Sequence, residues 1–422
     1  MSGGPLKVAL VALNSPGYRS LAMGYLRAYA QADRRLSGKA AFQTVDLDVG
    51  TDAWWVAYRV AGRAPDVAAF SVTCWNASTV YEACRLIGLA RPETSIVLGG
   101  PEVGPIAEDV LRANPSVDVV VRGEGEVTFA ELLGVMASGG KTWRVEGVTT
   151  RREGSVASAD DRQLVPDLDE LPSPYLAGLM EPVEGATYLE TYRGCPHRCG
   201  YCFEGKGYGR VRHFSQERVA AEVEWLADRA GLRLFSFIDP VFNLTEDRLG
   251  RMAALLEPHA SNGVRLHTVE VDIERIGPEE ARMLRRAGVR SVETGPQSVG
   301  AEALGICGRP FDRDRFRAGV AACKAEGISV ECDLILGLPG DGPAEFAQGM
   351  RFVTALDPGR VQMSTLHVLP GTPLWERASE LGLVFDPSAP HEVVATREAS
   401  FAELRRAEVM GLALQREYGA GA

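Results

Sequence analysis

The sequence predicts an α/β protein with two sheets of parallel strands. Over the first 140 residues, short apolar runs alternate with helical patterns, which favours a doubly wound parallel sheet of the Rossmann-like type. From residue 186 a second alternation of strand and helix begins, and its six repeats indicate a partial (β/α)6 barrel. A polar, proline-containing stretch between them favours neither helix nor strand. We therefore expect two domains, a linker and a short C-terminal helix in the 422 residues.

The N-terminal domain is expected to span residues 1–140. Five runs rich in Val, Ile and Ala have the length and the bounding turns of strands in such a sheet. They are residues 6–13, 41–49, 66–72, 95–100 and 117–123. Ligands of such sheets bind outside the carboxyl ends of the strands, so the loops after these runs are candidate binding loops.

Residues 141–185 are expected to form the linker, because they contain the runs RREGSVASADD and LVPDLDELPSPY. The barrel is expected over residues 186–375, and the C-terminal segment, residues 376–422, reads as one amphipathic helix. The expected barrel strands are residues 186–194, 233–239, 265–273, 289–295, 329–337 and 360–369. Active groups of barrels gather at the carboxyl ends of strands, which is where the loop after residue 194 begins.

The composition excludes several classes of protein. A net charge of -11 argues against a nonspecific nucleic-acid or membrane surface, and we expect neither partner. No apolar run is long enough to span a bilayer, and the N-terminus lacks the features of a signal peptide. Eight cysteines, of which five are scattered, suit a reducing cytoplasm better than a disulfide framework.

The most informative motif is the run RGCPHRCGYCF, in which Cys195, Cys199 and Cys202 form a three-thiolate chelate. Soft thiolates select iron–sulfur clusters, copper(I) or zinc. Because most cubane clusters take four cysteines, three in one loop predict a [4Fe-4S] cluster with one iron left open for a substrate. The alternative is a zinc site with His197 as fourth ligand, although a histidine inside the loop would strain a tetrahedral geometry.

The CxxxCxxC spacing, with Tyr201 before the third cysteine and Phe203 after it, resembles the radical S-adenosylmethionine (SAM) superfamily. The resemblance implies that the open iron binds the amino and carboxylate groups of SAM, and that an electron from the cluster cleaves the sulfonium. The runs FIDPVFN (237–243) and VETGPQS (292–298) are similar to SAM-contacting motifs of that family. The residues implied to contact SAM are Tyr201, Phe203, Asp239, Glu270, Glu293, Gln297 and Ser298.

Three loops of the first domain, SVTCWNAST (71–79), LGGPEVGP (98–105) and VRGEGEVTFAEL (121–132), together resemble the cobalamin-binding domain of cobalamin-dependent radical SAM enzymes. Their glycines let backbone approach a ligand closely. The residues implied to contact cobalamin are Ser71, Thr73, Trp75, Asn76, Gly99, Gly100, Pro101, Glu102, Gly123, Glu124, Gly125, Glu126 and Thr128. No histidine precedes His197, so this domain offers no histidine ligand to the lower face of cobalt.

The resemblance extends over roughly residues 1–375 and implies a methyltransferase that moves a methyl group from SAM through cobalamin to a carbon of its substrate. A small molecule or short peptide of bacterial natural-product metabolism is the expected substrate, the tryptophan indole ring being one option. A low-potential donor such as flavodoxin or ferredoxin is the expected electron source. The alternatives are a non-methylating ring formation or rearrangement by the same cofactors, and a non-catalytic corrinoid or iron–sulfur carrier.

Overall fold

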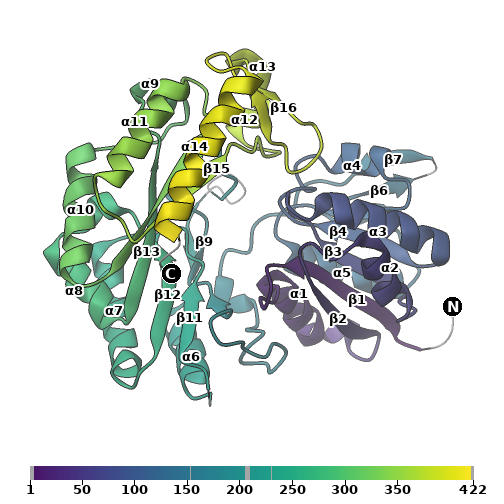
Figure 1. Cartoon of the computed structure of the whole chain (residues 1–422). Helices are drawn as coiled ribbons and strands as arrows, with labels where there is room; N and C mark the ends of the chain where they lie inside the picture. Colours follow the sequence, from purple (N-terminus) through teal and green to yellow (C-terminus); the bar gives the residue numbers. More distant parts are fainter. Residues whose placement is uncertain (1–3, 153, 205–209, 230, 420–422) are drawn as a thin grey trace. The chain divides into compact units, whose positions relative to one another are not determined.

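A computed structural model describes residues 4–419 except 153, 205–209 and 230. The chain divides into two compact units. The first unit comprises residues 1–183 with 388–390, and the second comprises residues 184–387 with 391–422. Each unit is built around a parallel sheet, drawn in purple to blue for the first and in teal to green for the second (Figure 1).

The first unit has a seven-stranded sheet with the order β2-β1-β3-β4-β5-β6-β7. The first five strands pair in parallel, and β6 and β7 add an antiparallel hairpin at the edge. The strands are β1 (Leu6–Asn14), β2 (Ala40–Asp48), β3 (Val67–Ser71), β4 (Ser95–Gly99), β5 (Val119–Val121), β6 (Val148–Arg152) and β7 (Ser155–Ser158). Six consecutive residues of β1 are buried, as expected for a central strand covered on both faces.

Helices cover both faces of this sheet and form two cores. One core packs α2, α3 and α4 against the sheet, and the other packs α1 and α5 against the opposite face. The helices are α1 (Leu21–Ala32), α2 (Ala53–Ala61), α3 (Ala77–Ala90), α4 (Ala107–Ala113) and α5 (Gly125–Ala137), with 3₁₀ turns at Arg34–Leu36, Thr142–Arg144 and Leu168–Glu170. This arrangement confirms the predicted doubly wound sheet.

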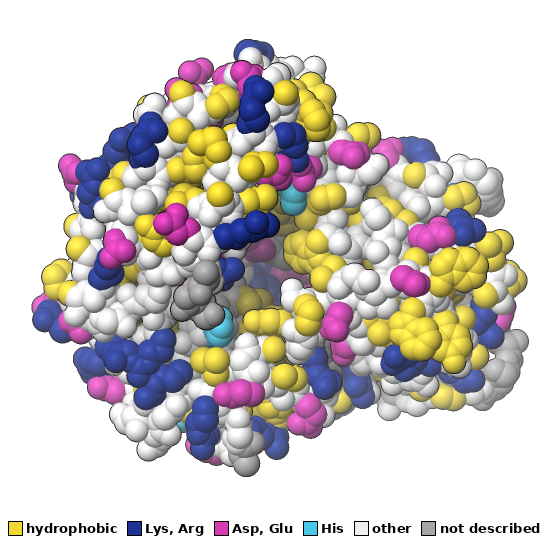
Figure 2. Space-filling model, in the orientation of Figure 1, with side chains coloured by type: hydrophobic (Ala, Val, Ile, Leu, Met, Phe, Trp, Pro, Cys, Tyr) yellow, Lys and Arg dark blue, Asp and Glu magenta, His cyan; other side chains and the backbone are white. Residues whose placement is uncertain are grey.

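Helix α2 also carries an exposed aromatic patch. Its core side presents Val56 and Val60, whereas Trp54 and Tyr58, 71% and 65% exposed, face solvent. Figure 2 shows these hydrophobic side chains gathered over α2.

The second unit has a six-stranded sheet of parallel strands in the order β15-β14-β13-β12-β11-β8. In the described residues its two outer strands do not pair with each other, so it is an open, partial barrel as predicted. The strands are β8 (Tyr188–Leu189), β11 (Leu234–Phe237), β12 (Arg265–Glu270), β13 (Val289–Gln297), β14 (Ser329–Leu336) and β15 (Arg360–Thr365). Two small antiparallel pairs join β9 (Tyr192–Arg193) to β10 (Arg212–His213) and β16 (Val384–Phe385) to β17 (Val393–Ala395).

Helices alternate with these strands and begin at clear sequence signals. Ser215, Thr245 and Asp312 accept backbone N–H groups at the N-termini of α6, α7 and α10, whereas α8 and α11 start with proline. The helices are α6 (Gln216–Ala227), α7 (Glu246–Ser261), α8 (Pro278–Arg286), α9 (Ala301–Ile306), α10 (Arg313–Ala325), α11 (Pro343–Thr354), α12 (Pro373–Glu376), α13 (Ala378–Leu381) and α14 (Phe401–Gly419), with a 3₁₀ turn at Ile273–Arg275. None of the helices in the described part of the chain has the length and apolarity needed to cross a membrane.

Three expectations need correction. The predicted linker, residues 141–185, contributes β6 and β7 to the first sheet. β6 pairs with β5, and β7 pairs with β6. The predicted strand at 186–194 is broken into β8 and β9, because the Thr191 backbone N–H bonds to Asp239 instead of to a neighbouring strand. The C-terminal segment, residues 376–422, contains α13 and the β16–β17 pair before its long helix.

Candidate functional site

The three-cysteine loop lies between β9 and β10, which pair with each other and are not part of the six-stranded sheet. Gly194 opens the loop with φ of 93°, and a Cβ there would lie 2.6 Å from the Arg210 carbonyl oxygen, so only glycine fits. The Tyr192 hydroxyl donates to the Val241 carbonyl at 3.0 Å and accepts from the Val241 N–H at 2.8 Å. The base of the loop is therefore fixed to the segment that follows β11.

The loop holds three free thiols, with Cys199 buried and Cys195 and Cys202 half-buried. Burial raises the pKa of Cys195, and it raises the pKa of Cys202 to about 11. Such thiols become ligands only when a metal takes the place of the proton. Three soft sulfur donors fit an iron–sulfur cluster, and no three His, Cys, Asp or Glu side chains in the described residues form a group that would hold a single metal ion.

Cys199 is the most buried of the three cysteines. Arg309 Nη1 donates to Cys199 Sγ at 3.6 Å, and its Nη2 donates to the Gly295 carbonyl at 2.6 Å. Tyr201 lies in the same loop, and burial raises its pKa. The loop is clamped on its other side, because the Gly200 N–H donates to the Cys307 carbonyl at 2.7 Å.

His197, the fourth ligand of the zinc alternative, has a different partner. Its Nε2 lies 3.7 Å from Asp272 Oδ2, and burial lowers its pKa while Asp272 opposes that shift. Asp272 also pairs with Arg275 at 3.2 Å. The sequence placed Asp272 on a strand beside Glu270, but β12 ends at Glu270, because the Asp272 N–H bonds to the Asn243 side chain and a 3₁₀ turn follows.

A row of carboxyl groups crosses the helix-free face of the second sheet. Glu270 on β12 is in register with Glu293 on β13, which is in register with Glu331 on β14. Glu331 accepts from Thr268 at 3.1 Å, from Ser291 at 3.0 Å and from Arg360 at 3.2 Å. It is therefore a satisfied anion that anchors neighbouring strands.

The other carboxyl groups of the row retain protons more strongly. Burial, with the charge of Glu293 next in weight, raises the pKa of Glu270 to about 7, even though its side chain is open to solvent on one side. Burial raises the pKa of Asp333 to about 9, with Glu293 and Glu270 adding to the effect. Burial also raises the pKa of Glu293, with the charge of Glu331 next in weight. The face can thus hold or exchange a proton near neutral pH.

Asp239, predicted to receive the SAM amino group, is enclosed by protein. Its carboxylate accepts from the Thr191 N–H at 2.8 Å, from the Thr191 hydroxyl at 2.6 Å and from Arg248 Nη2 at 2.5 Å. Its side chain is 0% exposed. We correct its assignment to a positioning residue, because these three donors occupy the carboxylate and no face is left for a ligand.

The remaining predicted SAM residues are divided between open and closed positions. Phe203 is half-buried in the cysteine loop, and Gln297 ends β13 with φ of 62°. Ser298 is 3% exposed, and its hydroxyl oxygen accepts the Gly300 N–H at 2.8 Å. Ser298 is corrected in the same way as Asp239, since its hydroxyl stabilises the turn after β13.

The predicted cobalamin loops follow β3, β4 and β5, which are neighbours in the first sheet, so the structure brings them to one edge. Trp75 is 62% exposed there, and the Thr73 hydroxyl is buried without a hydrogen-bond partner in the described residues. Gly100 has φ of 122°, and a Cβ would lie 2.3 Å from the Val72 carbonyl oxygen. The half-buried and exposed members of the set are Ser71, Thr73, Trp75, Gly99, Gly100, Pro101, Gly123, Glu124 and Gly125.

Four members of the predicted cobalamin set are turned inward: Asn76, Glu102, Glu126 and Thr128, each no more than 5% exposed. Asn76 accepts the Thr73 N–H at 2.9 Å and donates to the Ser71 and Leu13 carbonyls. Thr128 accepts from Arg162 at 2.8 Å. These four side chains are buried in the described structure, so it does not present them as the ligand contacts that the sequence predicted.

Sequence reasoning missed Arg309 and Asp333. The alternation of Glu331, Asp333 and Ile335 with buried residues on β14 is a period-two signal that would have placed Asp333 on the inner face. Arg309 had no local signal, because its contact with Cys199 spans 110 positions of the chain.

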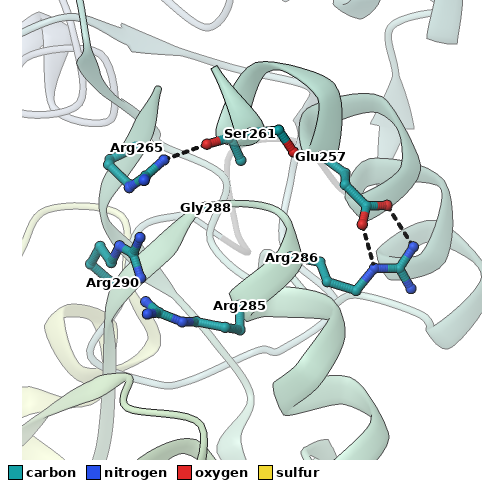
Figure 3. A pocket seen from close by; sticks show the side chains of 8 residues that line it. Glu257, Ser261, Arg265, Arg285, Arg286, Gly288 and Arg290 are labelled. Atoms are coloured by element: carbon teal, nitrogen blue, oxygen red, sulfur yellow. Dashed lines mark hydrogen bonds and ion pairs between the residues drawn. The ribbon is translucent and has the colours of Figure 1, made fainter. Parts of the chain in front are cut away.

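A separate basic cavity of about 210 Å³ lies at the amino end of the second sheet, away from the cysteine loop. Figure 3 shows Arg285 and Arg290 pointing toward one another, while Arg265 donates to the Ala260 carbonyl at 2.6 Å and Arg286 pairs with Glu257 at 2.6 Å. Arg265 is the first residue of β12. The cavity therefore contains none of the predicted site residues.

Comparison with known proteins assigns both units. Residues 29–133 match the B12 binding domain, and residues 189–353 match the radical SAM superfamily. An uncharacterized methyltransferase of Pyrococcus horikoshii is 27% identical over 321 residues, which cover 74% of this chain and 69% of that protein. The cobalamin-dependent radical SAM methyltransferase TokK of Streptomyces tokunonensis is 29% identical over 388 residues, which cover 87% of this chain and 56% of TokK.

A solved structure shares the fold of the whole chain. The radical SAM methyltransferase TsrM of Kitasatospora setae, with cobalamin and a [4Fe-4S] cluster bound, has a TM-score of 0.73 at 20% identity. The match covers 96% of this chain and 81% of TsrM. The same enzyme with tryptophan and a SAM analogue bound has a TM-score of 0.75 over 90% of this chain and 78% of that one. The chain spans little more than half the length of TokK.

Proposed function

Because the chain joins a B12-binding domain to a radical SAM domain and so belongs to the cobalamin-dependent radical SAM enzymes, we propose that it is a methyltransferase. The family's cofactors are a [4Fe-4S] cluster, SAM and cobalamin. The observation that carries the proposal is the three-cysteine loop at the carboxyl end of the second sheet, in a chain whose first sheet is a B12-binding domain. Bound together, these cofactors supply an electron that cleaves SAM and a cobalt centre that transfers its methyl group.

In this proposal, residues of the second unit hold the cluster and orient SAM and the substrate. Cys195, Cys199 and Cys202 hold the cluster, and Tyr192 and Gly194 fix the base of their loop. Glu270 and Glu293 lie on the helix-free face, where they would bind the cationic or hydroxyl groups of SAM and substrate. Asp333, whose pKa burial raises to about 9, is our candidate for a proton acceptor or donor.

In the first unit, the loops after β3, β4 and β5 would hold cobalamin. Gly100 lets the backbone turn tightly beside Val72, and the Thr73 hydroxyl is buried without a hydrogen-bond partner in the described part of the chain. A hydroxyl buried without a partner costs free energy, so a ligand that bonds it is favoured. This first-unit edge offers no histidine to cobalt, because the chain has none before His197.

We propose a small molecule or short peptide as the methyl acceptor. TsrM is described with tryptophan as substrate, and another relative is named a 2-(S-pantetheinyl)-carbapenam-3-carboxylate methyltransferase. A low-potential electron donor such as flavodoxin or ferredoxin would reduce the cluster.

The test is anaerobic reconstitution with iron, sulfide and cobalamin, followed by incubation with methyl-deuterated SAM, a low-potential reductant and a panel of small acceptors that includes tryptophan. We expect S-adenosylhomocysteine to form only in the cobalamin-loaded protein, with deuterated methyl on one acceptor. S-adenosylhomocysteine together with 5′-deoxyadenosine would assign radical methylation, and S-adenosylhomocysteine alone would assign polar transfer.

The control is the Cys199→Ala variant loaded with cobalamin alone. Formation of 5′-deoxyadenosine without S-adenosylhomocysteine across the panel would overturn the proposal in favour of a non-methylating radical reaction. Formation of neither product would count against catalysis.

A further inference from the structure

The contact between Arg309 and Cys199 lies outside every motif that defines the cysteine loop. Arg309 lies on the segment after α9, and its guanidinium reaches the loop from 110 positions away. One nitrogen donates to Cys199 Sγ at 3.6 Å, and another donates to the Gly295 carbonyl at 2.6 Å. The two hydrogen bonds fix the orientation of the planar guanidinium, because two of its nitrogens donate to different acceptors.

The backbone around Arg309 is attached to the same loop. The Gly200 N–H donates to the Cys307 carbonyl at 2.7 Å, and the Leu374 N–H donates to the Gly200 carbonyl at 3.1 Å. A Cβ on Gly200 would lie 3.4 Å from Cys307 Cα, so the two segments pack closely. Backbone contacts between the two segments therefore hold the Arg309 guanidinium in position beside Cys199.

The charge at this place has a direct electrostatic consequence. When Cys199 is a cluster ligand, its sulfur carries negative charge, and one-electron reduction of the cluster adds more. A cationic N–H donor to that sulfur stabilises the reduced form more than the oxidised form, since hydrogen bonds to the sulfurs and net charge help to set cluster potentials.

We propose that Arg309 is a positioning residue that holds Cys199 and raises the reduction potential of the bound cluster through its N–H···S hydrogen bond. The inference rests on the cluster of the proposed function, but it does not depend on methyl transfer or on cobalamin. It assigns to Arg309 a role in accepting the electron, before SAM is cleaved.

The experiment compares the SAM-free, reconstituted protein with its Arg309→Gln and Arg309→Lys variants in a redox titration followed by electron paramagnetic resonance. We expect the Gln variant to shift to more negative potential, with the ratio of reduced to oxidised cluster about tenfold lower at a fixed applied potential, the scale of one charge-assisted hydrogen bond. The Lys variant should lie between the two, because it keeps the charge and loses the fork.

The matched control is Arg275→Gln. Arg275 and Arg309 both act on the pKa of His197, but Arg275 bonds to Asp272 and no bond from it to a cysteine is found in the described residues. This variant should titrate close to the unchanged protein. If the reduction potential shifts equally in Arg309→Gln and Arg275→Gln, the shift is a general effect of losing a positive charge, and the specific role of the hydrogen bond is overturned.

A second measurement needs no variant. Protein labelled with ¹⁵N-arginine should show a ¹⁵N coupling to the reduced cluster in pulsed electron paramagnetic resonance, and unlabelled protein should show a ¹⁴N coupling in its place. Absence of that coupling, or an unchanged potential in Arg309→Gln, would overturn the proposal. If the potential shifts in Arg309→Gln but the protein forms no S-adenosylhomocysteine, the role of Arg309 is supported and methyl transfer is rejected. If the protein without substitutions assembles no cluster, both the role of Arg309 and the proposed function are rejected.

Discussion

At the scale of single residues, Glu331 and Asp333 on β14 have opposite surroundings. Glu331 is bonded by Arg360, Thr268 and Ser291, whereas burial and neighbouring carboxylates raise the pKa of Asp333 to about 9. The folded state therefore keeps a proton on Asp333 that the unfolded chain releases near 3.8. The contribution of Asp333 to the free energy of unfolding therefore falls as the pH rises from about 4 to about 9, because over this range the unfolded chain has lost the proton that the folded chain keeps.

Asp333→Asn should remove that loss, because asparagine resembles the neutral acid. We expect its free energy of unfolding to exceed that of the unchanged protein at pH 8 and to approach it at pH 5, in urea titrations under anaerobic conditions. Glu331→Gln should instead lower stability by about 1 kcal/mol at both pH values, since it loses a charged partner of Arg360. A loss of stability in Asp333→Asn at pH 8 would show that a carboxylate is required there.

Cys307 lies beside Cys199 and is 1% exposed. Its burial raises its pKa to about 12, as for a packed apolar thiol. We expect Cys307→Ala to retain the full iron content and the spectral change on SAM addition, whereas Cys199→Ala loses the cluster. Loss of iron in Cys307→Ala, in a variant that still folds by circular dichroism, would identify it as a fourth ligand that closes the unique iron.

At the scale of elements, Asp239, Thr191 and Arg248 join the end of β11, the break between β8 and β9, and α7. All three are buried, and Asp239 is the ion-pair partner of Arg248. Removing one member of a buried pair leaves an uncompensated charge, so Asp239→Asn should destabilise the second unit by about 3–5 kcal/mol. Denaturant unfolding measures that loss.

The SAM-binding interpretation of Asp239 makes the opposite prediction. If Asp239 received the SAM amino group, Asp239→Asn would fold with normal stability and bind SAM weakly in equilibrium dialysis. Arg248→Met with Asp239→Leu is the companion variant, because it removes both charges and should recover part of the stability lost by the single change.

The same elements explain what sequence could predict. β1 and β14 were found within a residue or two, since continuous burial on β1 and alternation on β14 leave strong patterns. The end of β12 was missed by three residues, because it is set by Asn243, a distant side chain that takes the Asp272 N–H. Local pattern also located the cysteines, but not Arg309, whose role depends on a contact made only in the folded chain.

At the scale of the whole molecule, the residues that we propose for the two cofactor sites belong to different units. Gly100 lies in the first unit on the turn after β4, with φ of 122° and no room for a Cβ beside Val72. Gly100→Ala should therefore distort the predicted cobalamin edge without touching the cysteine loop, which belongs to the second unit.

We expect Gly100→Ala, reconstituted with cobalamin and iron, to lose most of its corrinoid in the visible spectrum while keeping the iron and sulfide content of the unchanged protein. Gly134→Ala is the matched control, because Gly134 lies within α5 of the same unit and a Cβ there meets only Leu36 at 3.9 Å. Helix propensity predicts that this control is neutral or slightly stabilised. Equal corrinoid loss in both variants would indicate general unfolding of the first unit. Undiminished corrinoid in Gly100→Ala would place the cobalamin site away from the β4 turn, and the loops after β3 and β5 would then have to bind it without that turn.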